Sequence, residues 1–138
     1  MDTAAPARAT RALLPDVLGD DPALARDAAV RLHGVLSASP ILTLRTLDRG
    51  LREPGQRRFL RLHIEDIDAL GEGDFRASLL GIASVQRDGR LREAALSALL
   101  GQPGHLALGF VLNRLNDPYP PLRGSLGPCS VWGCCRCW

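Results

Sequence analysis

The sequence predicts an all-α protein built as an α-solenoid of about three and a half stacked helical hairpins. Four arginines, each just inside a predicted helix after a Pro, Gly or Asp turn, lie 31 to 34 residues apart: Arg26, Arg58, Arg92 and Arg123. A period of this length is typical of stacked repeat proteins. Leu and Ala dominate an apolar content of 46%, which favours helices. No segment of four to eight residues alternates as a half-buried strand does.

The composition fits one domain with an aliphatic core. The chain has 138 residues, of which only 4% are aromatic. No apolar run approaches the ~18 residues that a membrane span needs. Residues 1–10 contain no continuous apolar segment, so we expect a flexible N-terminus without a secretory signal. These features predict a cytoplasmic protein that makes no membrane contact.

The basic residues are of one kind. All 17 are arginine, and the net charge is only +2. A guanidinium group suits phosphate recognition. The accompanying abundance of Ala, Gly, Leu and Pro instead indicates GC-rich codon usage. Arginine content alone therefore does not predict a nucleic-acid partner.

The first predicted hairpin joins a short helix to a longer one. Residues 11–18 form the short helix, which Pro15 interrupts. A turn follows, in which Asp21 caps the next helix and Pro22 occupies its first turn. Apolar residues then recur at three- and four-residue steps, which marks a helix over about 23–36. Its buried face is predicted to comprise Ala25, Ala28, Ala29, Leu32 and Leu36.

Three further hairpins follow with the same alternation of tight turns and looser links. Their predicted apolar faces, one for each helix in chain order, are Ile41, Leu44, Leu47 and Leu51; Leu60, Ile64 and Ile67; Phe75, Leu79 and Ile82; Leu91, Ala95 and Leu99; and Leu108, Val111, Leu112 and Leu115. The last helix should continue from Leu122, but Gly124 and Pro128 interrupt it. Each apolar face needs a neighbour to cover it, which is the reason repeats stack.

The turn residue, the arginine and the small pair after it carry a family resemblance. The pattern is fullest over 88–99, through Asp88, Leu91, Arg92, Ala94 and Ala95. It is good over 21–32, partial over 117–126 and weak over 53–62. These segments resemble the HEAT-repeat family, in particular its short bacterial members. The resemblance covers residues 11–126 and implies a superhelix.

The resemblance also implies structural roles. In HEAT repeats the turn Asp and the helix Arg form a ladder between successive repeats, through charge-assisted hydrogen bonds. The corresponding residues here are Asp21, Arg26, Arg58, Asp88, Arg92, Asp117 and Arg123. We therefore expect these side chains to hold the fold together, and not to bind a ligand.

The sequence offers no catalytic constellation. His33, His63 and His105 share no motif, and no serine lies in a nucleophile elbow. The acidic run Ile64-Glu-Asp-Ile-Asp68 lacks a further ligand loop and favours a solvated face over a cation site. We expect no enzyme activity, no cofactor and no metal.

The tail, residues 127–138, differs from everything before it. It holds all four cysteines and both tryptophans. Cys134, Cys135 and Cys137 are too crowded to complete a tetrahedral zinc site with Cys129. One hypothesis is a native, disordered tail. The other is a frame shift from about Gly124 onward in a GC-rich gene, which would replace an Ala-rich helix and leave a truncated repeat array. We expect a disordered tail under either hypothesis.

The predicted function is a non-enzymatic scaffold that binds a protein partner of unknown identity. Positions five residues after the repeat arginines are equivalent and could line one concave face: Arg31, His63 and Ser97. The alternative is a nucleic-acid-associated protein, related to base-excision glycosylases; the scarcity of aromatic residues counts against it. A subunit of a cofactor lyase is a third class, for which no cofactor-attachment feature is present. Self-association through an uncapped C-terminal repeat is also expected.

Overall fold

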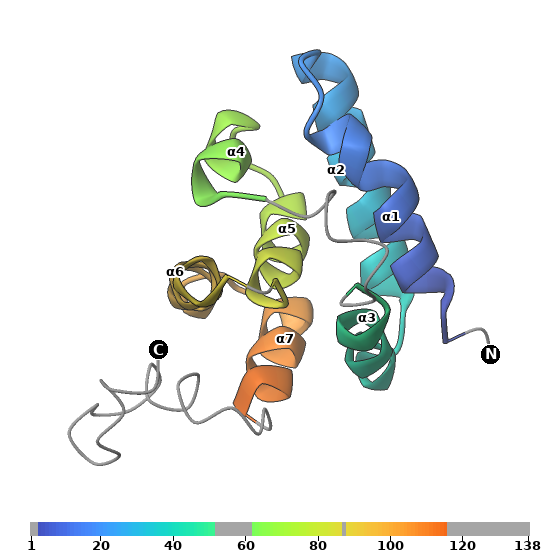
Figure 1. The fold of residues 1–138 in the computed structure, drawn as a ribbon, viewed down its shortest axis with the longest axis vertical. Helices are drawn as coiled ribbons and strands as arrows, with labels where there is room; N and C mark the ends of the chain where they lie inside the picture. The colour runs from blue at the N-terminus through green and yellow to red at the C-terminus, as the bar shows by residue number, and fades with distance from the viewer. Residues whose placement is uncertain (1–2, 52–61, 87, 116–138) are drawn as a thin grey trace.

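The computed structural model describes residues 3–51, 62–86 and 88–115, and over these residues it is helical without strands (Figure 1). The all-α prediction is therefore confirmed for the described chain. None of the described helices is long and apolar enough to cross a membrane. In chain order the elements are α1 (Ala5–Val17), α2 (Pro22–Ala38), the 3-10 helix η1 (Ile41–Thr43), α3 (Leu44–Leu51), α4 (Ile64–Ala69), α5 (Phe75–Ser84), α6 (Gly89–Leu100) and α7 (His105–Leu115).

Helices α1 and α2 form the first predicted hairpin. Asp21 caps α2, because its Oδ1 accepts hydrogen bonds from the backbone N–H groups of Ala23 at 3.0 Å and Leu24 at 3.4 Å. Pro22 occupies the first turn, where the missing N–H costs nothing. All five residues predicted for the apolar face of α2 are buried. The cap and the periodicity thus explain where α2 begins and which side it buries.

The first helix starts earlier than the sequence predicts. Residues 5–10, which we expected to be flexible, belong to α1. Ala7 is buried there, and the hydroxyl of Thr10 donates to the carbonyl oxygen of Pro6 at 2.8 Å. Ala7 lies against Gly50 of α3: a Cβ built on Gly50 would stand 2.8 Å from the Ala7 Cβ. Packing against α3 orders a segment whose local sequence carries little periodic signal.

Helix α5 occupies the centre of the structure. Every residue of this helix except Arg76 is buried, and it packs against α2, α4, α6 and α7. Figure 1 draws it between α2 and α6. A continuous run of apolar and small residues, from Ala77 to Ser84, allows burial on all sides. This helix is therefore the common core element of the described fold.

Two of the helix contacts join predicted hairpins that are not adjacent in the chain. In a solenoid each repeat contacts only its neighbours. Here α2, from the first predicted hairpin, packs on α5 of the third, and α3 of the second packs on α7 of the fourth. A hydrogen bond between His33 Nδ1 of α2 and Ser78 Oγ of α5, at 2.7 Å, strengthens the first of these contacts. The hairpins α1–α2 and α5–α6 are present, but their arrangement is more compact than a linear stack.

Helix α7 is rotated relative to its predicted orientation. Leu108, Leu112 and Leu115, expected in the core, are each about half exposed. The buried residues are instead Leu106, Ala107, Gly109, Phe110 and Arg114. Phe110 fits directly over Gly81 of α5, where a side chain would overlap its ring. This aromatic contact fixes the side of α7 that faces the core.

Substitution of Gly81 tests this contact. A Cβ there would overlap the fully buried Phe110 ring, so we expect Gly81→Ala to destabilise the fold by about 1–3 kcal/mol. Gly34 of α2 is the matched control, since a Cβ there meets nothing within 4 Å. Gly34→Ala should stabilise by about 0.5–1 kcal/mol. Urea unfolding followed by circular dichroism measures both; equal effects of the two substitutions would contradict the packing described.

Candidate protein-binding site

Exposed apolar side chains gather where η1 meets α7. Leu108, Leu112 and Leu115 of α7 and Ile41 and Leu42 of η1 are between 45 and 77% exposed. We call these five residues the η1–α7 patch. Helix α7 meets η1 and the start of α3 at Gly109: a Cβ on this glycine would lie 3.4 Å from Cγ2 of Ile41 in η1 and 3.1 Å from Cδ1 of Leu44 in α3. The absence of a side chain at Gly109 lets η1 approach α7 closely.

The three leucines of the patch lie on one side of α7. Leu108, Leu112 and Leu115 stand at i, i+4 and i+7, which places them on one side of a helix. Leu112 follows Gly109 by three positions, so it lies one turn along the side that meets Ile41. Scattered exposed leucines need no explanation, but a contiguous apolar surface is typical of a binding site.

The predicted ladder arginine of the first repeat has a structural role. Arg26 Nη1 donates to the Leu70 carbonyl oxygen at 2.8 Å, and Nη2 donates to that of Glu72 at 3.1 Å. Its guanidinium carbon lies 5.3 Å from the centre of the Phe75 ring, within the range of a cation–π interaction. Gly71, between the two acceptors, has a positive φ of 83°, which favours glycine. Arg26 therefore clamps the turn that leads into α5.

The other predicted ladder residues divide into three groups. Asp88 caps α6 as Asp21 caps α2, accepting from the N–H groups of Arg90 at 3.0 Å and Leu91 at 3.3 Å. Arg92 is buried in α6. Arg58, Asp117 and Arg123 lie outside the described residues, as does the tail at 127–138. The two aspartates thus stabilise their own helices, whereas Arg26 reaches the turn that leads into α5, in another predicted hairpin.

The three predicted binding residues lie on separate elements. Arg31 is on α2, exposed, with its Nη1 4.0 Å from Asp27 Oδ2 one turn away. His63 is exposed at the start of α4, where its backbone N–H donates to Asp66 Oδ2 at 3.0 Å. Ser97 is exposed on α6. Helices α2 and α6 both pack on α5 (Figure 1), and the proposal that the three share one concave face stays a prediction.

The described polar groups His33 and Ser78 contact each other between two helices of the core. The His33–Ser78 pair has the residue types of a base and a nucleophile, but Ser78 is completely buried. A substrate cannot reach a hydroxyl in that position, so the pair serves to join α2 to α5. In the acidic run, Asp68 Oδ1 accepts from Arg76 Nη1 at 2.8 Å. Among the described residues no three His, Cys, Asp or Glu side chains gather as metal ligands would.

Comparison with protein-family models, with curated proteins and with solved structures found no match to this chain. The described fold defines the chain as an all-helical protein with a buried central helix. The η1–α7 patch was missed at the sequence level because the periodicity of α7 assigns its leucines to the core. The signal that could have found it is Gly109, since a glycine within an apolar helix indicates close approach of another segment.

The role of Arg26 is testable by removing its charge. Arg26→Gln loses two hydrogen bonds and the contact with Phe75, and should destabilise the fold by about 1–2 kcal/mol. Arg31→Gln is the matched control on the same helix, because its exposed pair at 4.0 Å contributes little. Thermal unfolding of both variants makes the comparison. Equal melting temperatures would show that Arg26 does not hold the turn.

Proposed function

We propose that this chain is a non-enzymatic protein-binding module whose partner lays an apolar helix along the η1–α7 patch. The observation that carries the proposal is the outward orientation of Leu108, Leu112 and Leu115, a stripe whose periodicity is that of a buried helix face. A partner that covers this stripe removes apolar surface from water. Each leucine side chain is already about half buried, so its full burial by the partner would contribute about 1 kcal/mol to the free energy of binding.

The spacing of the stripe favours a helical occupant. Leucines at i, i+4 and i+7 form the kind of ridge that packs into the groove of another helix. The neighbouring Ile41 and Leu42 widen the surface on one side, so the partner helix would contact both elements. Recognition of an amphipathic helix by an apolar surface is a common mode of peptide binding.

The HEAT-like superhelix is a second part of this proposal. The α1–α2 and α5–α6 hairpins, and the Asp caps at Asp21 and Asp88, support a repeat origin. The contacts of α2 with α5 and of α3 with α7 count against a regular superhelix. In a repeat protein the open face of the last helix is the place where the next helix would pack. The partner helix would then pack on α7 as the next helix of a repeat array does.

Photo-crosslinking tests the proposal at one residue. A benzophenone amino acid replaces Leu112 in the full chain, which is irradiated in native lysate, and the captured protein is then purified and its binding reconstituted. We expect a crosslink to a helical segment of another protein, at both low and high salt. A crosslink within the chain itself, or to a second copy, would instead show that the patch is covered internally or by self-association.

A pair of double variants supplies the control. Leu108→Ser with Leu112→Ser should weaken binding of the reconstituted partner at least tenfold, since two half-exposed leucines are lost from the centre of the patch. Leu24→Ser with Val30→Ser removes apolar groups of similar exposure, 48 and 53%, from α2. These changes should leave binding intact. Similar losses in the two double variants would overturn the assignment of the patch; titration calorimetry measures each.

A further inference from the structure

The exposed side of α7 continues beyond its leucines to His105. His105, Leu108, Leu112 and Leu115 stand at i, i+3, i+7 and i+10, a heptad spacing that keeps them on one side of the helix. All four are exposed, and none of them belongs to the buried side of α7. The stripe therefore begins with an imidazole and continues with three apolar side chains.

His105 lies at one end of the η1–α7 patch. Gly109, where α7 meets Ile41 of η1, follows His105 by four positions and precedes Leu112 by three. Residues three and four positions apart are neighbours on the surface of a helix. His105 and Leu112 therefore flank the contact with η1, one turn away on either side. A partner helix that covers Leu108 and extends towards the start of α7 also covers His105.

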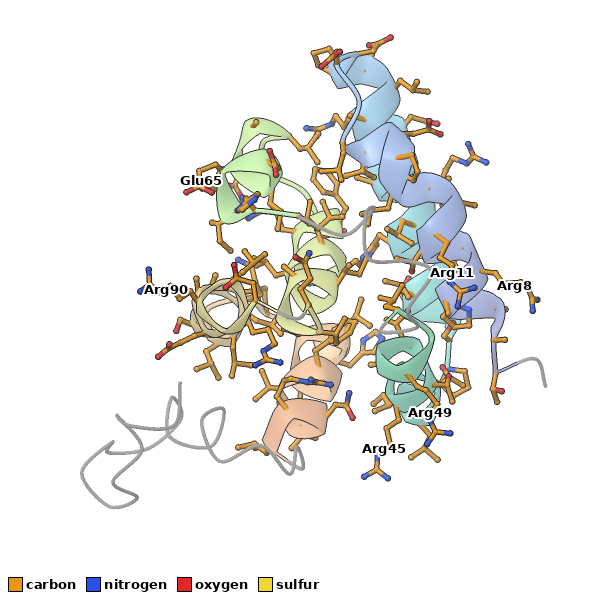
Figure 2. All side chains as sticks on the ribbon, in the orientation of Figure 1. Arg8, Arg11, Arg45, Arg49, Glu65 and Arg90 are labelled. Atoms are coloured by element: carbon orange, nitrogen blue, oxygen red, sulfur yellow. The ribbon has the colours of Figure 1, made fainter. Side chains whose placement is uncertain are left out.

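The imidazole of His105 is not paired within the described chain. Over the described residues its side chain forms no hydrogen bond or ion pair. Neither α7, nor η1, nor the link at 101–104 contains an acidic residue. Figure 2 shows Glu65 of the acidic run on α4, with α5 between it and α7. A polar group that is covered without a hydrogen-bond partner costs free energy, so the helix that covers His105 has to supply that partner.

We propose that the partner helix carries a carboxylate that pairs with His105, at one end of an apolar stripe with heptad spacing. This inference rests on the proposed function, since it names the chemistry of the helix that covers the patch. An imidazole N–H donates to a carboxylate in a charge-assisted hydrogen bond, which is about twice as strong as one between neutral groups. One ring nitrogen carries a hydrogen in the neutral form and both do in the charged form, so the bond forms in either state.

The pairing gives the partner helix a defined register. An apolar stripe alone allows a second helix to slide along it, because every leucine offers the same contact. A single polar residue in such a stripe specifies the register, since a shifted helix leaves it covered and unpaired. His105 is the first residue of α7, where the helix dipole also favours an anionic group over a cationic one. The leucines thus supply affinity, and His105 selects an acidic residue at one position.

Model peptides test the pairing with the full chain. Each peptide is an amphipathic helix of three heptads with leucine at the a and d positions, except for one a position at an end of the stripe, which is Glu, Gln or Lys. This position is at the N-terminal end in one set and at the C-terminal end in the other, so both directions are sampled. The fluorescein-labelled peptides, too dilute to associate with one another, are followed by anisotropy. In one set the Glu peptide should bind about fivefold to tenfold more tightly than the Gln peptide, and the Lys peptide most weakly.

Variants of the chain assign the preference to His105. His105→Ala should abolish the preference for the Glu peptide, and His105→Gln, which keeps an N–H donor, should retain part of it. His63→Gln is the matched control, because His63 is an exposed histidine just before α4, and it should leave the preference unchanged. Equal binding of the Glu and Gln peptides in both sets would overturn the pairing, as would a preference for Glu that survives His105→Ala.

The pairing and the proposed function fail in different ways. Suppose that all the peptides bind equally well and that Leu108→Ser with Leu112→Ser abolishes this binding. The η1–α7 patch then binds apolar helices, and only the carboxylate pairing is wrong. If no peptide binds the chain, or if the double variant binds as well as the unaltered chain, the proposed function is itself contradicted, and the pairing with it.

Discussion

The close contact between Phe110 of α7 and Gly81 of α5 is the constraint on which the rest of the described structure depends. Helix α5 is buried along almost its whole length, and a helix buried on all sides must accept neighbours at short range. Gly81 provides the one position where an aromatic ring can lie directly on the backbone. Once Phe110 occupies it, the rotation of α7 is fixed, and its leucine stripe must face away from the core.

Two close contacts position the outer helices α7 and α3. The rotation of α7 places Leu108, Leu112 and Leu115 beside η1, where Gly109 admits Ile41. The contact of Ala7 with Gly50 sets α3 against α1, and Arg11 Nη2 donates to the Gly50 carbonyl oxygen at 2.7 Å. In both places a glycine lets side chains of another helical segment approach its backbone closely.

The sequence predicted correctly those features that depend on residues close together in the chain. Asp21 followed by Pro22 identified the start of α2, because a cap and a first-turn proline act within a few residues. The apolar faces of α2, α5 and α6 were also predicted, since each is covered on the side that its periodicity marks. The early start of α1 and the rotation of α7 depend on Ala7 meeting Gly50 and Phe110 meeting Gly81, contacts between distant segments. Periodicity carries no information on which residues of two helices will meet. For the same reason Arg31, His63 and Ser97, equivalent in the repeat, lie on elements that the period alone could not place in space.

The rotation of α7 is tested most directly by nuclear Overhauser effects between assigned protons in isotope-labelled full-length chain. The account predicts strong effects from the Phe110 ring protons to the Gly81 α-protons, and none from the Leu112 methyl groups to α5. The reverse pattern, with Leu112 against Gly81 and the Phe110 ring in solvent, would contradict it. It would return the leucine stripe to the core and remove the apolar surface assigned to partner binding.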